Sequence, residues 1–160
     1  MNVESILLWG FVGTVILTTL MAASTGLGLS RMNIPLMIGA MLTPNRDRAQ
    51  VVGAGAHFLN GWIFASVYAL AFEGWGSATW WAGAATGLVH ALFVLTVGMA
   101  FLPGMHPRMA SETHGPTPTR RLQPPGFLAL NYGRATPLVT ILAHLAYGAI
   151  LGGFYELAGS

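Results

Sequence analysis

Long stretches without a charged residue divide the chain. They lie between Glu4 and Arg31, Arg48 and Glu73, Glu73 and Arg108, and Arg134 and Glu156. A helix needs about 20 apolar residues to cross the hydrocarbon core of a bilayer. The strands of a membrane β-barrel would instead alternate apolar and polar positions over about ten residues, and these stretches do not. The pattern therefore predicts four transmembrane helices, at about 5–29, 49–72, 78–101 and 136–157.

Two longer connections separate these predicted helices, at 30–48 and 102–135. The first contains a short apolar run from Ile34 to Leu42, which is too short to span. We expect this run to be an interfacial or re-entrant segment packed under the bundle. The second connection is rich in proline, and its middle is polar.

A weak repeat relates the second and fourth predicted helices. When His57 is aligned with His144, Gly61 meets Gly148 and Tyr68 meets Tyr155. Both helices run in the same direction, so the repeat predicts two parallel hairpins related by an axis along the membrane normal. The expected fold is thus an all-α integral membrane protein, a four-transmembrane-helix bundle of two parallel-repeat hairpins, forming a single domain over 1–160.

Composition supports a membrane protein. Hydrophobic residues make up 54% of the chain and charged residues only 8%, whereas a soluble domain has about 25% charged residues. This argues against a soluble globular protein, a disordered chain and a nucleic-acid binder; with seven basic residues there is too little positive charge to follow a phosphate backbone. The absence of cysteine excludes disulfides, thiolate metal sites and thiol catalysis.

The arginines predict the orientation. All seven lie in the 30–48 and 102–135 connections, whereas Glu4, Glu73 and Glu156 lie outside them. Because positive loops stay in the cytoplasm, we expect both connections to be cytoplasmic and both termini to be outside. The predicted location is a bacterial inner membrane, with the lipid bilayer as the first partner and no nucleic acid.

Histidines provide the main functional clue, because His57, His90 and His144 lie inside predicted spans. At 1.5 Å per residue, each lies roughly 13–17 Å from the inner boundary, near the midplane of a core about 30 Å thick. An ionisable side chain at this depth is a functional hypothesis in its own right. We therefore predict that the three imidazoles face one interior cavity.

Polar residues share the helix faces of these histidines and are candidates for supporting contacts. They are Thr18, Asn60, Thr86, Thr140 and Tyr147. Gly61, Gly87 and Gly148 each lie within four residues of a histidine and could form a slot for a flat ring. Gly83-x3-Gly87 and Gly148-x3-Gly152 are also small-residue stripes that allow close helix packing.

Neutral imidazole suits iron, copper and zinc, and one or two histidines can hold a haem or other tetrapyrrole. The sequence therefore predicts that His57, His90 and His144 bind such a ring or a transition metal, with electron transfer as the expected role. The repeat favours His57 and His144 as the main pair and His90 as a third contact. No carboxylate lies at their depth, which argues against a di-iron carboxylate site.

Other functions stay open. The histidines could serve only as hydrogen-bonding contacts between helices, or they could form part of a small transporter or proton pathway. The chain could also be a non-catalytic structural or accessory subunit of a larger membrane complex, or a homo-oligomer. No Gly-x-Ser-x-Gly turn and no glycine-rich phosphate loop is present, so the sequence identifies no reaction and leaves open whether the protein is an enzyme.

Overall fold

The computed structural model describes residues 1–111 and 113–158, and this part of the chain contains helices and no β-strand. The long helices are α1 (Val3–Gly26), α3 (Arg46–Trp75), α4 (Trp80–Phe93) and α6 (Thr136–Phe154). A π-helical turn, η1 (Val94–Gly98), joins α4 to α5 (Met99–Met105). Two short elements lie in the connections: α2 (Ile34–Leu42) and the 3-10 helix η2 (Phe127–Tyr132).

Side-chain caps explain where the first four α-helices begin. Asn2, Asn33, Asn45 and Thr79 each accept a hydrogen bond from a backbone N–H in the first turn that follows. Such caps satisfy amide groups that the helix itself leaves without a partner. At its other end, α3 stops at Gly76, whose φ of 66° lies in the left-handed region that glycine adopts without strain.

Three helical segments are long and apolar enough to cross a membrane within the described residues: Val3–Gly26, Trp80–Met105 and Thr136–Phe154. They correspond to the first, third and fourth predicted spans. The second predicted span lies in α3, which has 30 residues but does not reach the same apolarity. Arg46, Asp47 and Arg48 occupy its first turn, and His57 and Asn60 interrupt its middle.

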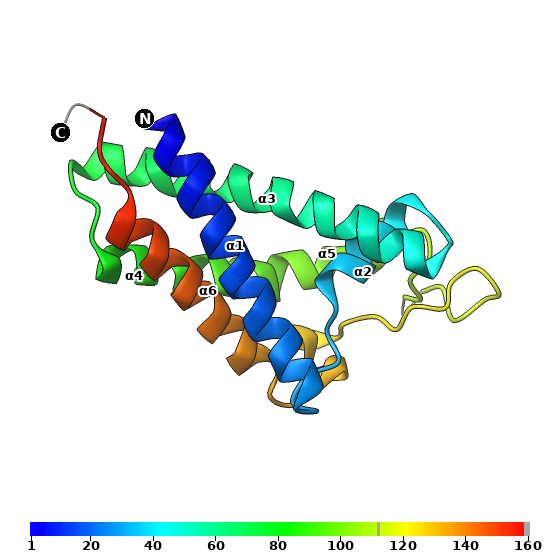
Figure 1. The fold of residues 1–160 in the computed structure, drawn as a ribbon. Helices are drawn as coiled ribbons and strands as arrows, with labels where there is room; N and C mark the ends of the chain where they lie inside the picture. The colour runs from blue at the N-terminus through cyan, green and yellow to red at the C-terminus, as the bar shows by residue number, and fades with distance from the viewer. Residues whose placement is uncertain (112, 159–160) are drawn as a thin grey trace.

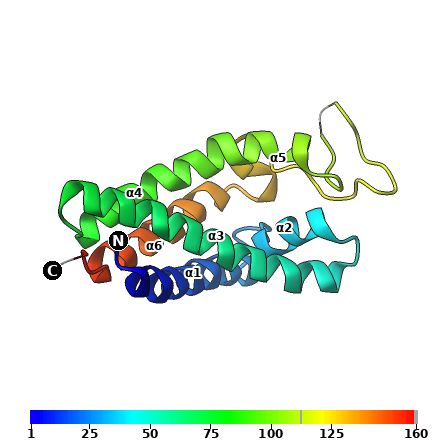
Figure 2. The same ribbon diagram turned by 90° about the horizontal axis from the view of Figure 1, so that it is seen from above.

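Figures 1 and 2 show α1, α3, α6 and the α4–α5 segment running alongside one another, with both termini and the α3–α4 turn at one end. The connections that carry the arginines lie at the opposite end, together with α2. Neighbouring helices pack in the order α4, α6, α1, α3, while α3 lies away from α4 along most of its length. The four long segments therefore form a row in backbone packing, and its two ends, α3 and α4, meet through side chains at His90.

Glycine brings α4 and α6 into the closest contact in this row. A Cβ atom on Gly83 would collide with the carbonyl oxygen of Gly148, and one on Gly148 would collide with that of Gly83. A Cβ atom on Gly87 would likewise collide with the carbonyl oxygen of His144. The small-residue stripes thus pack as predicted, because only glycine lets the two backbones approach this far.

The short apolar run between the first two long helices forms an ordered helix, α2, with the predicted bounds of 34–42. It packs on α3 through Gly39 and Gly53, where an added Cβ would meet backbone on the other helix. The connection before η2 holds α2 from the other side: His106 Nε2 lies 2.9 Å from the carbonyl oxygen of Met37. Arg108 donates a hydrogen bond to the carbonyl of Ala40.

A hydrogen-bond cluster joins three segments at the end that carries the termini. The Tyr155 hydroxyl donates to Glu73 Oε1 at 2.7 Å and accepts from the Asn2 N–H at 2.9 Å. The Ala158 N–H also donates to Glu73 Oε1, at 2.9 Å. These two donors, the Ala158 amide first, lower the pKa of the Glu73 carboxyl, since both stabilise its charged form.

Candidate functional site

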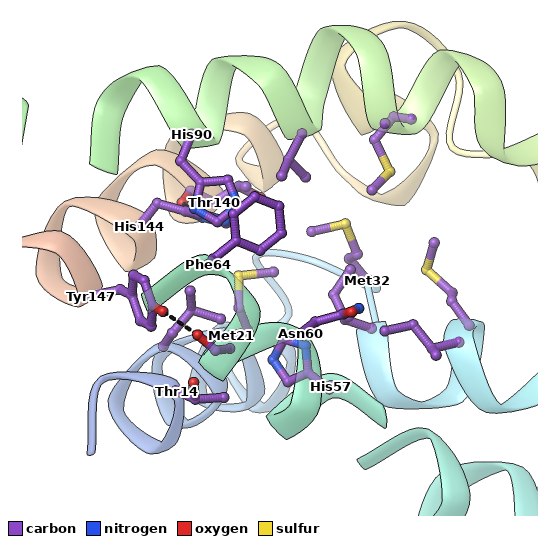
Figure 3. A pocket seen from close by; sticks show the side chains of 18 of the residues that line it. Thr14, Met21, Met32, His57, Asn60, Phe64, His90, Thr140, His144 and Tyr147 are labelled. Atoms are coloured by element: carbon purple, nitrogen blue, oxygen red, sulfur yellow. Dashed lines mark hydrogen bonds between the residues drawn. The ribbon is translucent and has the colours of Figure 1, made fainter. Parts of the chain in front are cut away.

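A cavity of about 250 Å³ lies between α3 on one side and the α4–α5 segment on the other, with α1, α2 and α6 completing its walls (Figure 3). Most of its lining is aliphatic, aromatic or thioether. The polar or ionisable side chains that line it are Thr14, His57, Asn60, His90, Thr140, His144 and Tyr147. Aspartate, glutamate, lysine and arginine are absent from this lining, so the cavity offers no charge to balance that of a bound ion.

The structure brings the three predicted histidines, His57, His90 and His144, to this one cavity. Of the predicted supporting residues, Asn60, Thr140 and Tyr147 line it too. Tyr147 reaches from α6 across to α3, where its hydroxyl donates to the carbonyl oxygen of Gly61 at 2.6 Å.

Two predicted supporting residues lie elsewhere. Thr18 lines a smaller adjoining cavity of about 200 Å³, which His57 also borders. Thr86 lines neither cavity, and its hydroxyl donates to the carbonyl oxygen of Ala82 at 2.9 Å within α4. The close contact between α4 and α6 is made by the neighbouring Gly83 and Gly87 and not by Thr86.

The closest pair of histidines is His90 and His144. Their ring centroids lie 4.7 Å apart, with the ring planes at 86°. Figure 3 shows both rings on one side of the cavity and His57 beside Asn60 on another. The repeat-based expectation that His57 and His144 form the main pair therefore differs from the structure. The reason is that the glycine contact between α4 and α6 carries His90, not His57, up to His144.

Neighbouring groups orient both paired rings. His144 Nδ1 lies 2.8 Å from the carbonyl oxygen of Thr140. A carbonyl can only accept, so Nδ1 carries the proton and a neutral His144 keeps a lone pair on Nε2. His90 Nδ1 lies 3.3 Å from the Tyr68 hydroxyl, and Phe64 stacks on the His90 ring with centroids 3.9 Å apart.

Thr140 carries the one buried side-chain oxygen or nitrogen without a hydrogen-bond partner among the described residues. The residue is only 1% exposed, and it lines the cavity one helical turn before His144. An unsatisfied buried hydroxyl costs roughly 1–3 kcal/mol. Because so little of Thr140 is accessible, this hydroxyl does not face the open space of the cavity.

No protein-family model, curated protein or solved structure matches this chain. What the cavity can hold must therefore be judged from its size and its atoms.

The two kinds of ligand predicted from the sequence, a transition metal and a tetrapyrrole, can each be compared with this cavity. No group of three His, Cys, Asp or Glu side chains in the described part of the chain is close enough together to hold a metal ion, so the three histidines do not form a common metal site. A tetrapyrrole stays a prediction: the cavity of about 250 Å³ is smaller than the roughly 300–1,000 Å³ of pockets that enclose drug-sized ligands, so it would enclose such a ring only in part. The glycines expected to form a ring slot, Gly61, Gly87 and Gly148, instead contact neighbouring helices.

Several site features were not identified from the sequence. Phe64 lies seven residues after His57, on the same helical face, so its spacing could have indicated it; Tyr68, eleven residues after His57, is already part of the predicted repeat. The π-helical turn borders the cavity through Val94 and Gly98. Such turns are frequent at functional sites, but no residue pattern in 94–98 predicts one.

Proposed function

We propose that the protein is an integral membrane protein that binds a small ligand in this cavity, with His90 and His144 as its polar contacts. The supporting observation is that His90 and His144, whose ring centroids lie 4.7 Å apart, both line this largely apolar cavity. Largely apolar pockets with a few convergent polar groups are the common form of small-molecule sites. A redox-active ligand here would give the electron-transfer role expected from the sequence.

The test is to purify the protein in mild detergent without chelator, extract it with organic solvent and analyse the extract by mass spectrometry. We expect one small organic molecule bound to the wild-type chain and lost from His90→Ala and His144→Ala. His114→Ala is the matched control, because His114 is exposed and lies outside the cavity. An empty extract from wild-type protein that also binds no added ligand would overturn the proposal.

A single Cu(I) ion is the second candidate. The cavity is lined by four methionines, Met21, Met32, Met37 and Met99, and thioether with imidazole is a donor set that suits Cu(I). A divalent ion is less suited, because the lining has no carboxylate to balance its charge. Elemental analysis of the same preparation would favour this candidate if it found copper in a one-to-one ratio with the chain.

We further propose that α3 is a fourth membrane span and that both termini lie outside. Its charged residues are confined to its two ends, and it packs along α1, itself a candidate span. The chain has no native cysteine, so single-cysteine variants can report topology. Pro44→Cys and Ser77→Cys, placed before and after α3, should react from opposite sides of the membrane, with Pro44→Cys cytoplasmic; reaction of both from one side would exclude a spanning α3.

Assembly with other membrane subunits, or with further copies of the chain, stays a prediction. Large apolar side chains such as Leu59, Ile63 and Val67 are exposed on α3 and suit either lipid or a partner helix. Size measurement in mild detergent separates these cases: a stable stoichiometric partner favours an accessory subunit, and a single chain that keeps its ligand favours an independent binding protein.

A further inference from the structure

Building on the proposed function, we propose that the ligand is a lipid-soluble ring compound with a hydroxyl group, of the quinol class, and that its hydroxyl lies against His90 and His144. This inference concerns binding alone and requires no chemical step. Three independent features support it: the size of the cavity, the hydrogen-bonding polarity of its two close imidazoles, and its position between helices that contact each other through side chains and not through close backbone packing.

The size of the cavity suits one substituted ring. A cavity of about 150 Å³ in another protein holds a benzene molecule, and the cavity here is about 250 Å³. The difference leaves space for ring substituents but not for a second large ring system. Phe64, half-buried, lines the same cavity and stacks on His90, so aromatic rings form part of the wall that a flat ligand would contact.

The two close imidazoles have complementary hydrogen-bonding roles. His144 presents a lone pair on Nε2, because its Nδ1 proton is donated to the Thr140 carbonyl. We assign the donor role in the Tyr68–His90 contact to the tyrosine, since its hydroxyl makes no other hydrogen bond in the described part of the chain. His90 then carries its proton on Nε2. The pair therefore offers one donor and one acceptor.

A hydroxyl group matches both roles at once, because it can donate to His144 and accept from His90. A quinone carbonyl can only accept, so it would leave the His144 lone pair without a partner. The site is thus built for the reduced, hydroxyl-bearing form of a ring in preference to its oxidised form.

The position of the cavity favours a ligand that arrives from the lipid. Its two long walls are α3, through His57 and Phe64, and the α4–α5 segment, through His90 and Leu102. These helices do not pack along one another over this stretch. The rings of Phe64 and Tyr68 on α3 close part of this space against His90, so we infer that a molecule dissolved in the bilayer enters beside these rings. A water-soluble ion would have to leave its hydration shell for a lining without a single charged residue.

Calorimetric titration of the detergent-solubilised protein without oxygen tests the inference. Three ring compounds of similar size serve as probes: durohydroquinone, duroquinone and the dimethyl ether of durohydroquinone. We expect durohydroquinone to bind at least tenfold more tightly than the other two, since only it can donate a hydrogen bond. Equal affinities, or tighter binding of duroquinone, would overturn the assignment of the hydroxyl form.

The outcomes separate this inference from the proposed function. If none of the three ring compounds binds but a different small molecule is extracted from the wild-type protein and lost from His144→Ala, the quinol assignment is wrong and the binding function stands. If the protein neither retains nor binds any small molecule, both fail. His144→Ala should also lose the preference for durohydroquinone over its dimethyl ether, because the acceptor for its proton is gone.

Discussion

The two sides of α4 differ sharply. On the side that meets α6, glycines leave backbone against backbone, and nothing larger than a hydrogen atom fits at Gly83 or Gly148. On the side that meets α3, the helices are held apart, and the contacts are made by large rings: Phe64 on His90, and Tyr68 beside the same imidazole.

This difference explains where a cavity can exist in so apolar a chain. The glycine contacts leave no space between α4 and α6. The large rings between α4 and α3 keep those two backbones apart, and space remains beside the rings. The close pair also carries the paired histidines, since His90 and His144 come from α4 and α6. The α4–α6 contact, here called the tight side of α4, therefore sets the geometry of the two imidazoles. The α4–α3 contact, the loose side, provides the space next to them.

The largest expected effect is on the tight side. Gly83→Leu places a side chain where the backbone of α6 lies, and overpacking against backbone should lower the free energy of unfolding by about 3 kcal/mol. Gly55→Leu is the control, because a Cβ at Gly55 meets nothing within 4 Å. Thermal unfolding in detergent compares the two variants; similar losses in both would mean that α4 and α6 do not pack through these glycines.

The next effect concerns the ring contact across the loose side. Phe64→Ala removes the side chain stacked on His90, and for a half-buried ring we expect a loss of about 2 kcal/mol, below the cost for a fully buried one. Ile63→Ala changes a neighbouring residue that is 61% exposed and should have little effect. A stable Phe64→Ala protein with unchanged ligand binding would argue against this contact.

A smaller effect is expected where α6 reaches α3 at the edge of the cavity. Tyr147→Phe removes the hydroxyl that donates to the Gly61 carbonyl at 2.6 Å, which should lower the free energy of unfolding by about 1 kcal/mol. Chemical denaturation of the wild-type and variant proteins measures it. An unchanged free energy of unfolding would mean that the bond from the Tyr147 hydroxyl to the Gly61 carbonyl adds no stability.

The sequence predicts most of the helices and the meeting of the histidines. Charge-free runs located the three apolar spans, and the run from Ile34 to Leu42 gave α2, because both depend on local composition. The estimated depth of each histidine in the membrane predicts that His57, His90 and His144 share one cavity, and they do. The estimate works because the rise per residue sets how far along a helix a side chain lies.

What the sequence did not predict is which histidines are neighbours. The repeat matched His57 with His144, but depth says nothing of how each helix is rotated about its axis. That rotation depends on contacts between helices, here Gly87 against the His144 backbone, which place His90 at the centre instead. The remaining predicted span, 49–72, is less apolar than the other three because it contains His57 and Asn60: a lack of charge does not by itself make a segment apolar.

The smallest effect is at the end that carries the termini, remote from both sides of α4. The lowered pKa of Glu73 means that its hydrogen bonds contribute stability above the ordinary carboxyl pKa of about 4.3. That contribution is lost as pH falls through the lowered value. Thermal unfolding from pH 7 down to pH 3 should show a small loss that Glu73→Gln, whose side chain does not titrate, lacks; an identical pH profile in the variant would rule this out.

The most direct test is nitrogen-15 NMR of the histidine side chains as durohydroquinone is added. Before addition, His144 should show an unprotonated Nε2, since Nδ1 donates to Thr140. On addition, we expect the Nε2 signals of His144 and His90 to shift together, while those of His57 and the exposed His114 stay in place. Shifts at His57 and His144 with His90 unaffected would contradict the claim that the α4–α6 pair holds the ligand.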